Sequence, residues 1–262
     1  MGYGTIMDGV SFIVRVRNEE ETLEASLRSL KGLTIPHEIV VILHLCTDRS
    51  KQIAETLQAE GFPIRIKEYN IKTSRAGYET MATDATSEHS LVTYYNFGIS
   101  DVKHIWNVKW DADYVTTPEF LEYFNTKIWT KPEQSTKISF DSKSEDGTNT
   151  EPFLFSGNFH YTKYFFWEIL SAKDDVVASH ANVYVNTLSK LSNVKSYWKE
   201  PAWFFDDSDE AKTVLDRYIT ITRVCGNEPV GCARALNPEC NNPFWYVQQH
   251  LKILEEAGIR AI

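Results

Sequence analysis

The chain has 262 residues and the composition of a soluble globular protein, with 42% hydrophobic and 24% charged residues. At roughly 150 residues per domain, this length fits one large domain or two small ones. The formal net charge is −9, and no long basic run occurs. This argues against a nucleic-acid or anionic-membrane surface, because both select clustered Lys and Arg.

The cysteines do not have the spacing of a zinc site, because none of them forms a C-x-x-C pair. They are Cys46, Cys225, Cys232 and Cys240. Ordinary reduced thiols are the simpler interpretation. The N-terminus has no basic segment followed by an apolar one, and no apolar stretch approaches the ~20 residues of a membrane span. We expect a soluble, cytoplasmic protein without a membrane span.

Short apolar runs rich in β-branched residues predict strands in the first part of the chain. They cover residues 10–16, 38–45, 63–68 and 105–110. Helical patterns lie between them, and such alternation predicts a parallel sheet covered on both faces. Ligands bind beyond the carboxyl ends of the strands in such sheets. Site residues are therefore sought at 15–19, 43–48, 68–75 and 111–114.

The polar turn after the first strand predicts a helix start. Asn18 and Glu21 have the spacing of a capping box, so we expect Asn18 to cap this helix. Its apolar stripe is formed by Leu23, Leu27 and Leu30. A second helix is expected to be capped by Thr47 or Asp48, and a third to cover residues 87–98.

The second half of the chain is less regular. Thr117 before Pro118 predicts a capped helix start. Residues 142–151 are polar and contain a glycine, so we expect a surface loop and consider it as a lid over a bound substrate. Further strands are expected at 137–141, 153–160 and 182–185, and a closing helix at 251–257.

The sharpest chemical feature is Asp111-Ala112-Asp113, directly after the fourth predicted strand. Two carboxylates separated by one residue on a turn can face one hard cation, Mg²⁺ or Mn²⁺. Such a cation leaves positions open for substrate phosphates and stabilises charge on a leaving diphosphate. The spacing alone is a weak signal. Its position at the end of a strand favours a metal site.

These features together resemble the family 2-like glycosyltransferases with the GT-A fold. The resemblance covers roughly residues 10–125 and rests on Val10–Leu30, Glu38–Ser50 and Asp111–Asp113, which are similar to that family's opening strand–turn–helix, second strand and metal-binding motif. It implies a single α/β domain over 1–262 with a Rossmann-like, mostly parallel central sheet flanked by helices. It also implies a nucleotide-sugar-binding half at 1–115 and a less regular acceptor-binding half at 116–262.

The resemblance further implies an activity and its site residues. The chain would transfer a sugar from a nucleotide-diphosphate donor to a hydroxyl group of a glycan or glycoconjugate, with Mn²⁺ or Mg²⁺ at Asp111 and Asp113. By analogy with the family, the transfer would invert the anomeric carbon. The donor site would contain the first turn, the end of the second strand, a basic segment and the metal motif. Its residues would be Arg15, Val16, Arg17, Asn18, Glu19, His44, Lys72, Arg75, Asp111, Ala112 and Asp113.

The catalytic base would be a carboxylate in the second half of the chain. Two acidic clusters qualify, and the candidates are Asp175 in one and Asp206 or Asp207 in the other. We favour the second cluster, because Trp203-Phe204-Phe205 beside it would wall an acceptor pocket. A general base must lie within hydrogen-bond reach of the proton that it removes, so only a structure can choose between them.

Two departures from the family pattern leave the donor open. The usual P-x-Y-N sequence is Arg15-Val16-Arg17-Asn18, and the acidic pair after the second strand is Leu43-His44. An acidic side chain there suits a uracil N–H, so a UDP-sugar is not specifically indicated. Two alternatives remain: a sugar-1-phosphate nucleotidyltransferase, although the first turn lacks glycine, and a non-catalytic sugar-binding module of the same fold. No G-x-S-x-G or P-loop sequence occurs.

Overall fold

The computed structural model describes residues 7–145, 147–150, 153–165, 167–189, 203–225, 252 and 255–257. The chain forms two compact units. Unit 1 contains residues 1–70, 97–160 and 171–198, and unit 2 contains residues 71–96, 161–170 and 199–262. The expected division into a nucleotide-sugar-binding half at 1–115 and an acceptor-binding half at 116–262 stays a prediction.

The described elements alternate strands and helices up to β4 and then become rich in strands. The first part comprises β1 (Met7–Val16), α1 (Leu23–Ser29), η1 (Leu30–Gly32), β2 (His37–Leu43), α2 (Ser50–Ala59), β3 (Ile64–Glu68), α3 (Tyr78–Ala82), α4 (Leu91–Ile99) and β4 (His104–Asp111). The second part comprises β5 (Tyr114–Thr116), α5 (Pro118–Thr126), β6 (Ser135–Ser144), β7 (Gly147–Asn149), β8 (Phe153–Ser156), β9 (Phe159–Tyr164), β10 (Trp167–Ala172), β11 (Val176–Thr187), η2 (Trp203–Phe205) and α7 (Asp209–Cys225).

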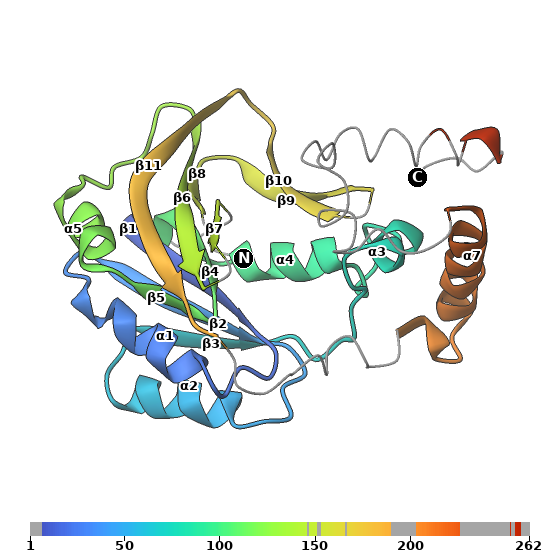
Figure 1. Ribbon diagram of the computed structural model, residues 1–262, viewed down its shortest axis with the longest axis horizontal. Helices are drawn as coiled ribbons and strands as arrows, with labels where there is room; N and C mark the ends of the chain where they lie inside the picture. The colour runs from blue at the N-terminus through green and yellow to red at the C-terminus, as the bar shows by residue number, and fades with distance from the viewer. Residues whose placement is uncertain are drawn as a thin grey trace. The chain divides into compact units, whose positions relative to one another are not determined.

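Unit 1 is built on one mixed sheet, which Figure 1 shows with helices α1, α2 and α5 beside it. In the described residues the strand order is β3-β2-β1-β4-β8-β6-β11-β5, with β7 paired to β6. The four strands from β3 to β4 are parallel to one another. Beyond β4, the strand β8 runs antiparallel to both of its neighbours. The predicted α/β fold class and the four predicted N-terminal strands are confirmed.

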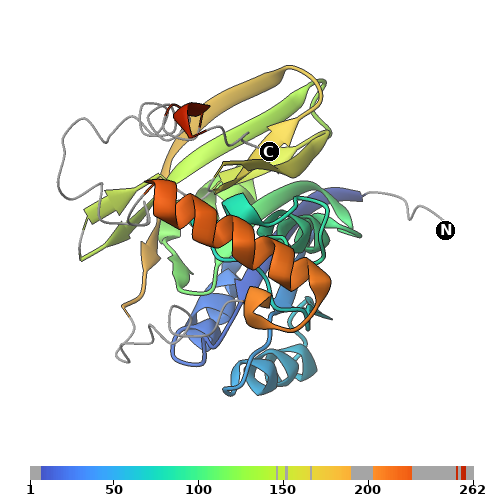
Figure 2. The same cartoon turned by 90° about the vertical axis from the view of Figure 1, so that its right-hand side faces the viewer.

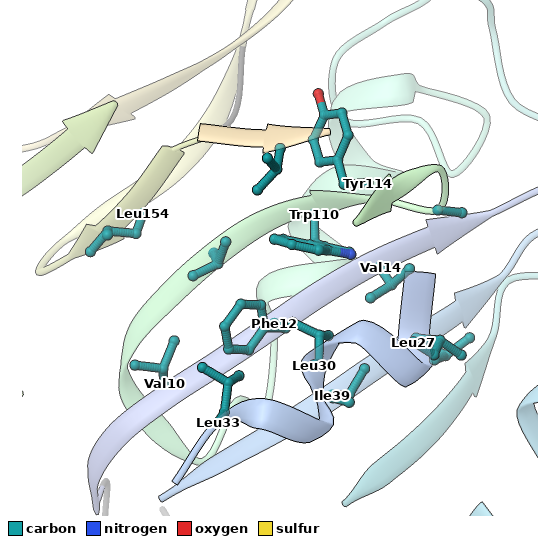
Figure 3. Close-up of a cluster of buried hydrophobic side chains, with 14 of the residues drawn as sticks. Val10, Phe12, Val14, Leu27, Leu30, Leu33, Ile39, Trp110, Tyr114 and Leu154 are labelled. Atoms are coloured by element: carbon teal, nitrogen blue, oxygen red, sulfur yellow. The ribbon is translucent and has the colours of Figure 1, made fainter. Parts of the chain in front are cut away.

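The core of unit 1 lies on one face of this sheet. Figure 3 shows Val10, Phe12 and Val14 of β1 directed towards helix α1 and its neighbours. Alternate residues of a strand point to opposite faces, so these three share one face. The predicted helix stripe of Leu23, Leu27 and Leu30 is fully buried against them. The opposite face of β1 and β2 is also covered, because Gly98 of α4 approaches Ile13 and Ile42 closely.

Several local predictions are wrong. The N-cap of α2 is Arg49, without a side-chain hydrogen bond, rather than Thr47 or Asp48. Asn18 does not cap α1, whose N-cap is Thr22 without a side-chain hydrogen bond. Asn18 instead adopts a left-handed backbone, with φ of 55°, and accepts hydrogen bonds from the backbone N–H groups of Thr47 and Asp48. These partners lie in the turn after β2, far from Asn18 in the sequence, so the spacing of Asn18 and Glu21 did not indicate them. Thr117 does cap α5, because its side chain accepts from the N–H of Phe120.

Another wrong prediction is the surface loop at 142–151. Its described part is a hairpin, in which Ser142–Ser144 of β6 pair with Gly147–Asn149 of β7. Gly147 has a φ of 134°, a conformation that glycine adopts readily. A polar strand lacks the apolar alternation that identifies strands in a sequence, so the hairpin was missed. The lid expected at these residues stays a prediction.

Unit 2 has its own small core. The cluster contains Tyr78 and Ala82 of α3, Trp203 and Phe204 of η2, and Ala211 of α7. Figures 1 and 2 both show α7 beside α3, in agreement with the contacts between these helices. The predicted helix at 251–257 lies mostly outside the described residues. No described helix is long and apolar enough to cross a membrane.

Candidate active site

The carboxyl ends of β1, β2 and β4 meet at one edge of the sheet in unit 1. Arg15 of β1 is level with Asp111 of β4 on one side and with Ile42 of β2 on the other. Because all three strands are parallel, the turns that follow them leave the sheet at the same edge. This is the location at which ligands bind in open α/β sheets, and the sequence placed its candidates there.

Asp111 is held by two cationic side chains at this edge. Its Oδ1 accepts a hydrogen bond from Arg15 at 3.1 Å, and its Oδ2 accepts one from Lys109 at 3.2 Å. Burial by itself would raise the pKa of Asp111, but the charges of Lys109 and Arg15 outweigh it and lower the pKa to about 2. The Asp111 carboxylate is therefore ionised at any physiological pH and already carries two charged partners.

Asp111 and Asp113 line a pocket of about 320 Å³. Asp113 is half-buried in the turn after β4, where its backbone carbonyl accepts from the N–H of Leu188. The remaining wall comes from β5, the β6–β7 hairpin and the end of β11, and is formed by Tyr114, Ser142, Ser144, Gly147, Thr148, Asn149 and Thr187. Hydroxyl and amide groups therefore face the two carboxylates across the pocket.

The carboxylates of Asp111 and Asp113 are the kind of oxygen ligand that Mg²⁺ or Mn²⁺ takes. Both oxygens of Asp111 already accept from cations, so an additional metal ion would compete with Arg15 and Lys109. These metal ions are often held by only one or two carboxylates and substrate phosphates. Among the described residues there is no cluster of three or more His, Cys, Asp or Glu side chains that would form an all-protein metal site.

The turns after β1 and β2 are joined by side chains. The Arg17 guanidinium lies 3.4 Å from the ring nitrogens of His44. His44 is buried and packs edge-on against Tyr69. The backbone N–H of Glu19 donates to the Ser50 hydroxyl at 2.8 Å. Arg17, Asn18, Glu19 and His44 thus belong to one connected pair of turns.

Two of the predicted donor-site residues face the core. Val16 is fully buried, and Ala112 is 4% exposed. Their side chains pack in the hydrophobic cluster of unit 1, so only their backbone atoms are suited to meet a ligand. Cys46 lies in the same turn as His44 and is a free thiol whose pKa is raised by burial. The other cysteine side chains lie outside the described residues.

Asp175 lies far from the pocket along its own strand. It precedes Val176, the first residue of β11, whereas Thr187 at the other end of β11 lines the pocket. At about 3.3 Å per residue, the strand separates the two ends by roughly 35 Å of chain. Asp175 is exposed. The structure therefore does not bring Asp175 together with Asp111 and Asp113.

The remaining predicted residues belong to unit 2. Lys72 forms an ion pair with Asp206 at 3.1 Å, and both side chains are about half exposed. Arg75 is held by the nearly buried carboxylate of Glu79. Asp207 is exposed. The sequence did not foresee that the predicted phosphate-binding lysine and a predicted catalytic carboxylate would be partners.

The predicted aromatic wall beside Asp206 needs correction. Trp203 and Phe204 are each 1% exposed and form part of the core of unit 2, whereas Phe205 is 62% exposed. His89 stacks on Trp203 with ring centroids 4.0 Å apart. Only Phe205 of the three aromatics is therefore available to an acceptor. Three consecutive aromatics cannot be sorted into core and surface without knowing which of them the following helix covers.

Sequence reasoning also missed residues at the candidate site. Lys109 was not selected, although its spacing of two residues from Asp111 on a strand places both on one face. The hydroxyl and amide groups of the β6–β7 hairpin were assigned to a loop. They reach the pocket because β6 lies in the same sheet as β4. Local sequence patterns do not indicate which distant strands share a sheet.

No protein-family profile matches this chain. No curated protein matches it either. Several solved structures are similar to this chain at low sequence identity. The Staphylococcus aureus protein TarS, residues 1–349, is 19% identical over 54% of this chain and 38% of that chain, with a TM-score of 0.39. This chain therefore spans well under half of the TarS fragment's length.

Two other similar structures are a mannosyltransferase and a glucosyl-3-phosphoglycerate synthase. The mannosyltransferase PcManGT from Pyrobaculum calidifontis, in complex with GDP-Man and Mn²⁺, is 13% identical over 95% of this chain and 86% of that chain, with a TM-score of 0.47. Glucosyl-3-phosphoglycerate synthase from Mycobacterium tuberculosis, in complex with Mn²⁺, UDP and glucosyl-3-phosphoglycerate, is 17% identical over 51% of this chain and 44% of that chain, with a TM-score of 0.33. All three are distant similarities.

Proposed function

We propose that this chain is a metal-dependent glycosyltransferase, which transfers a sugar from a nucleotide-diphosphate donor to a hydroxyl group of a glycan or glycoconjugate. The observation that carries the proposal is the pocket beyond the carboxyl end of β4. It combines Asp111 and Asp113 with a wall of hydroxyl and amide side chains. Such groups suit a ligand that contains both phosphates and sugar hydroxyls.

The two aspartates have different roles in this proposal. Asp113 would hold Mn²⁺ or Mg²⁺ together with the donor diphosphate, and the bound metal would act as a Lewis acid for the departing nucleoside diphosphate. Asp111 positions Arg15 and Lys109 at the same edge through its two hydrogen bonds. Since its pKa is about 2, Asp111 stays ionised and keeps both cations in place.

The turns after β1 and β2 would bind the nucleoside. Arg17, Asn18, Glu19 and His44 would surround this position. His44 supplies a nitrogen-bearing side chain where the resembling family has a carboxylate, and Arg17 stands where that family has tyrosine. The general base would come from unit 2, with Asp206 or Asp207 deprotonating the acceptor hydroxyl. The expected stereochemical outcome, inversion, follows the family resemblance. Asp175 does not suit this role, because the length of β11 separates it from the pocket.

The proposal is tested with Asp113→Asn. We expect the variant to fold normally and to lose release of nucleoside diphosphate from a panel of UDP-, GDP- and TDP-sugars in the presence of Mn²⁺. Asp101→Asn is a matched control, because Asp101 is an exposed carboxylate before β4. Wild-type activity in Asp113→Asn would contradict the metal assignment. Binding of a sugar nucleotide without turnover of any acceptor would support the non-catalytic module instead.

A further inference from the structure

The turn that carries the two pocket carboxylates, residues 111–113, is attached to helix α1 at both of its ends. Trp110 lies just before the turn in β4, and Thr116 ends β5 just after it. The indole Nε1 of Trp110 donates a hydrogen bond to the Ser26 hydroxyl at 2.9 Å. The backbone N–H of Thr116 donates to the Ser29 hydroxyl at 3.2 Å, and the Thr116 hydroxyl donates to the Ser29 carbonyl at 2.9 Å. Two serines of one helix therefore hold the two flanks of the turn.

Ser26 is a buried polar residue on the apolar face of α1. It is 0% exposed, as are Leu23, Leu27 and Trp110. Alanine would form the helix at least as well at this position, so helix formation does not explain the serine. The bond to Trp110 explains it, because a buried indole N–H without an acceptor costs free energy. Ser26 is not among the described residues that line the pocket, so its hydroxyl acts on the site through Trp110.

Trp110 connects Ser26 to the pocket in two ways. Neighbouring residues of a strand point to opposite faces, so the buried indole fixes the backbone from which the Asp111 side chain leaves in the other direction. The indole ring also packs edge-on against the ring of Tyr114, with centroids 5.8 Å apart. Tyr114 lines the pocket together with Asp113. Movement of the indole would therefore displace both the carboxylate of Asp111 and a wall of the pocket.

We propose that Ser26 is a positioning residue for the two carboxylates of the pocket, with Ser29 as its counterpart at the other end of the turn. The two serines lie three residues apart on α1 and therefore on the same side of the helix. They keep the backbone of residues 111–116 in one conformation, so Asp111 and Asp113 line the pocket before a ligand binds. That this geometry serves a metal ion and a diphosphate rests on the proposed function. The attachment of the turn to α1 does not.

The test compares Ser26→Ala with Ser11→Ala in the full chain. Ser11 is also fully buried, lies towards the amino end of β1, and donates to Glu38 at 2.8 Å, so each variant loses one buried hydrogen bond. Backbone hydrogen exchange of residues 111–116 should become about five- to tenfold faster in Ser26→Ala, as expected for loss of one hydrogen bond. Ser11→Ala should change this segment no more than it changes the rest of the sheet.

The second measurement is binding of Mn²⁺ together with UDP, GDP or TDP, followed by the electron paramagnetic resonance signal of free Mn²⁺. Ser26→Ala should raise the apparent Kd for Mn²⁺ at least about tenfold, because loss of a group that orients metal ligands weakens metal affinity to this extent. Ser11→Ala should leave this Kd unchanged. A purely structural role of Ser26 would lower the melting temperature of both variants without changing the Kd.

Three results would overturn the proposal. They are unchanged exchange of residues 111–116 in Ser26→Ala, an unchanged Kd for Mn²⁺ where the wild type binds the ion, and equal effects of Ser26→Ala and Ser11→Ala. If Ser26→Ala does not fold, Ser29→Ala replaces it, because Ser29 is half-buried and its carbonyl keeps the bond to Thr116. If the wild type binds no Mn²⁺ with any of the three nucleotides, the proposed function fails, and the exchange of residues 111–116 still decides the role of Ser26.

Discussion

The ionised state of Asp111 predicts a measurable contribution to stability. The pKa of Asp111 is lowered from 3.8 to about 2 by Lys109 and Arg15, against the effect of burial. One pKa unit corresponds to about 1.4 kcal/mol, and the side chain is 31% exposed, so screening by solvent reduces the total to about 2 kcal/mol. Asp111→Asn should lower the free energy of unfolding by about this amount at pH 7.

The pH dependence of this difference provides the stricter test. Because the folded-state pKa lies below the unfolded one, the stabilisation is complete above about pH 4 and is lost as the pH falls towards 2. The difference between wild type and Asp111→Asn should therefore shrink by about half near pH 3. Urea unfolding at pH 7, 4 and 3 measures it, and Asp8→Asn on the neighbouring strand β1 is the control. Equal stabilities at pH 7, or a difference that does not change with pH, would refute the reasoning.

Three further predictions concern the framework around the site. Thr117→Ala removes the cap of α5 and the hydrogen bond to the Tyr184 carbonyl, so urea unfolding should show a loss of about 1–2 kcal/mol; an unchanged midpoint would exclude the cap. Gly157 has a φ of 117°, and a Cβ there would lie 2.7 Å from the Cα of Ser135, whereas Gly61 has a φ of 94° and open space. Gly61→Ala should lower the free energy of unfolding by about 1–2 kcal/mol, from the backbone conformation alone. Gly157→Ala should lower the free energy of unfolding and the melting temperature by more. Equal losses in the two variants would contradict the close approach at Gly157. Asp206→Asn breaks an exposed ion pair with Lys72 and should change stability by less than about 1 kcal/mol while reducing kcat, if Asp206 is the base; unchanged turnover would leave Asp207.

The sequence was most informative where local pattern and tertiary structure agree. The strands β1 to β4 are apolar because helices cover the sheet, so periodicity alone located them. Parallel strands place their carboxyl ends at one edge, which is why Arg15 and Asp111 could be expected to lie close together. The short helix α3 and the polar β6–β7 hairpin lack such a pattern and were missed.

The long-range contacts of the predicted site residues could not be obtained from the sequence. The hydrogen bond from Trp110 to Ser26 joins residues 84 positions apart. Likewise, the pairing of Lys72 with Asp206 joins residues 134 positions apart. Such pairs depend on which strands and helices become neighbours, and a single sequence contains no direct record of that.

Binding of sugar nucleotides with and without Mn²⁺ tests the central claim most directly. The measurement is a thermal-unfolding series for wild type and Asp113→Asn with UDP-, GDP-, TDP- and CMP-sugars. A ligand present at about 100 times its Kd adds roughly 2.7 kcal/mol to stability. We predict that one nucleotide class stabilises the wild type only when Mn²⁺ is present, and that Asp113→Asn loses this stabilisation. An absence of stabilisation by every donor, or equal stabilisation of Asp113→Asn, would contradict the proposal of a metal-dependent glycosyltransferase site at Asp113.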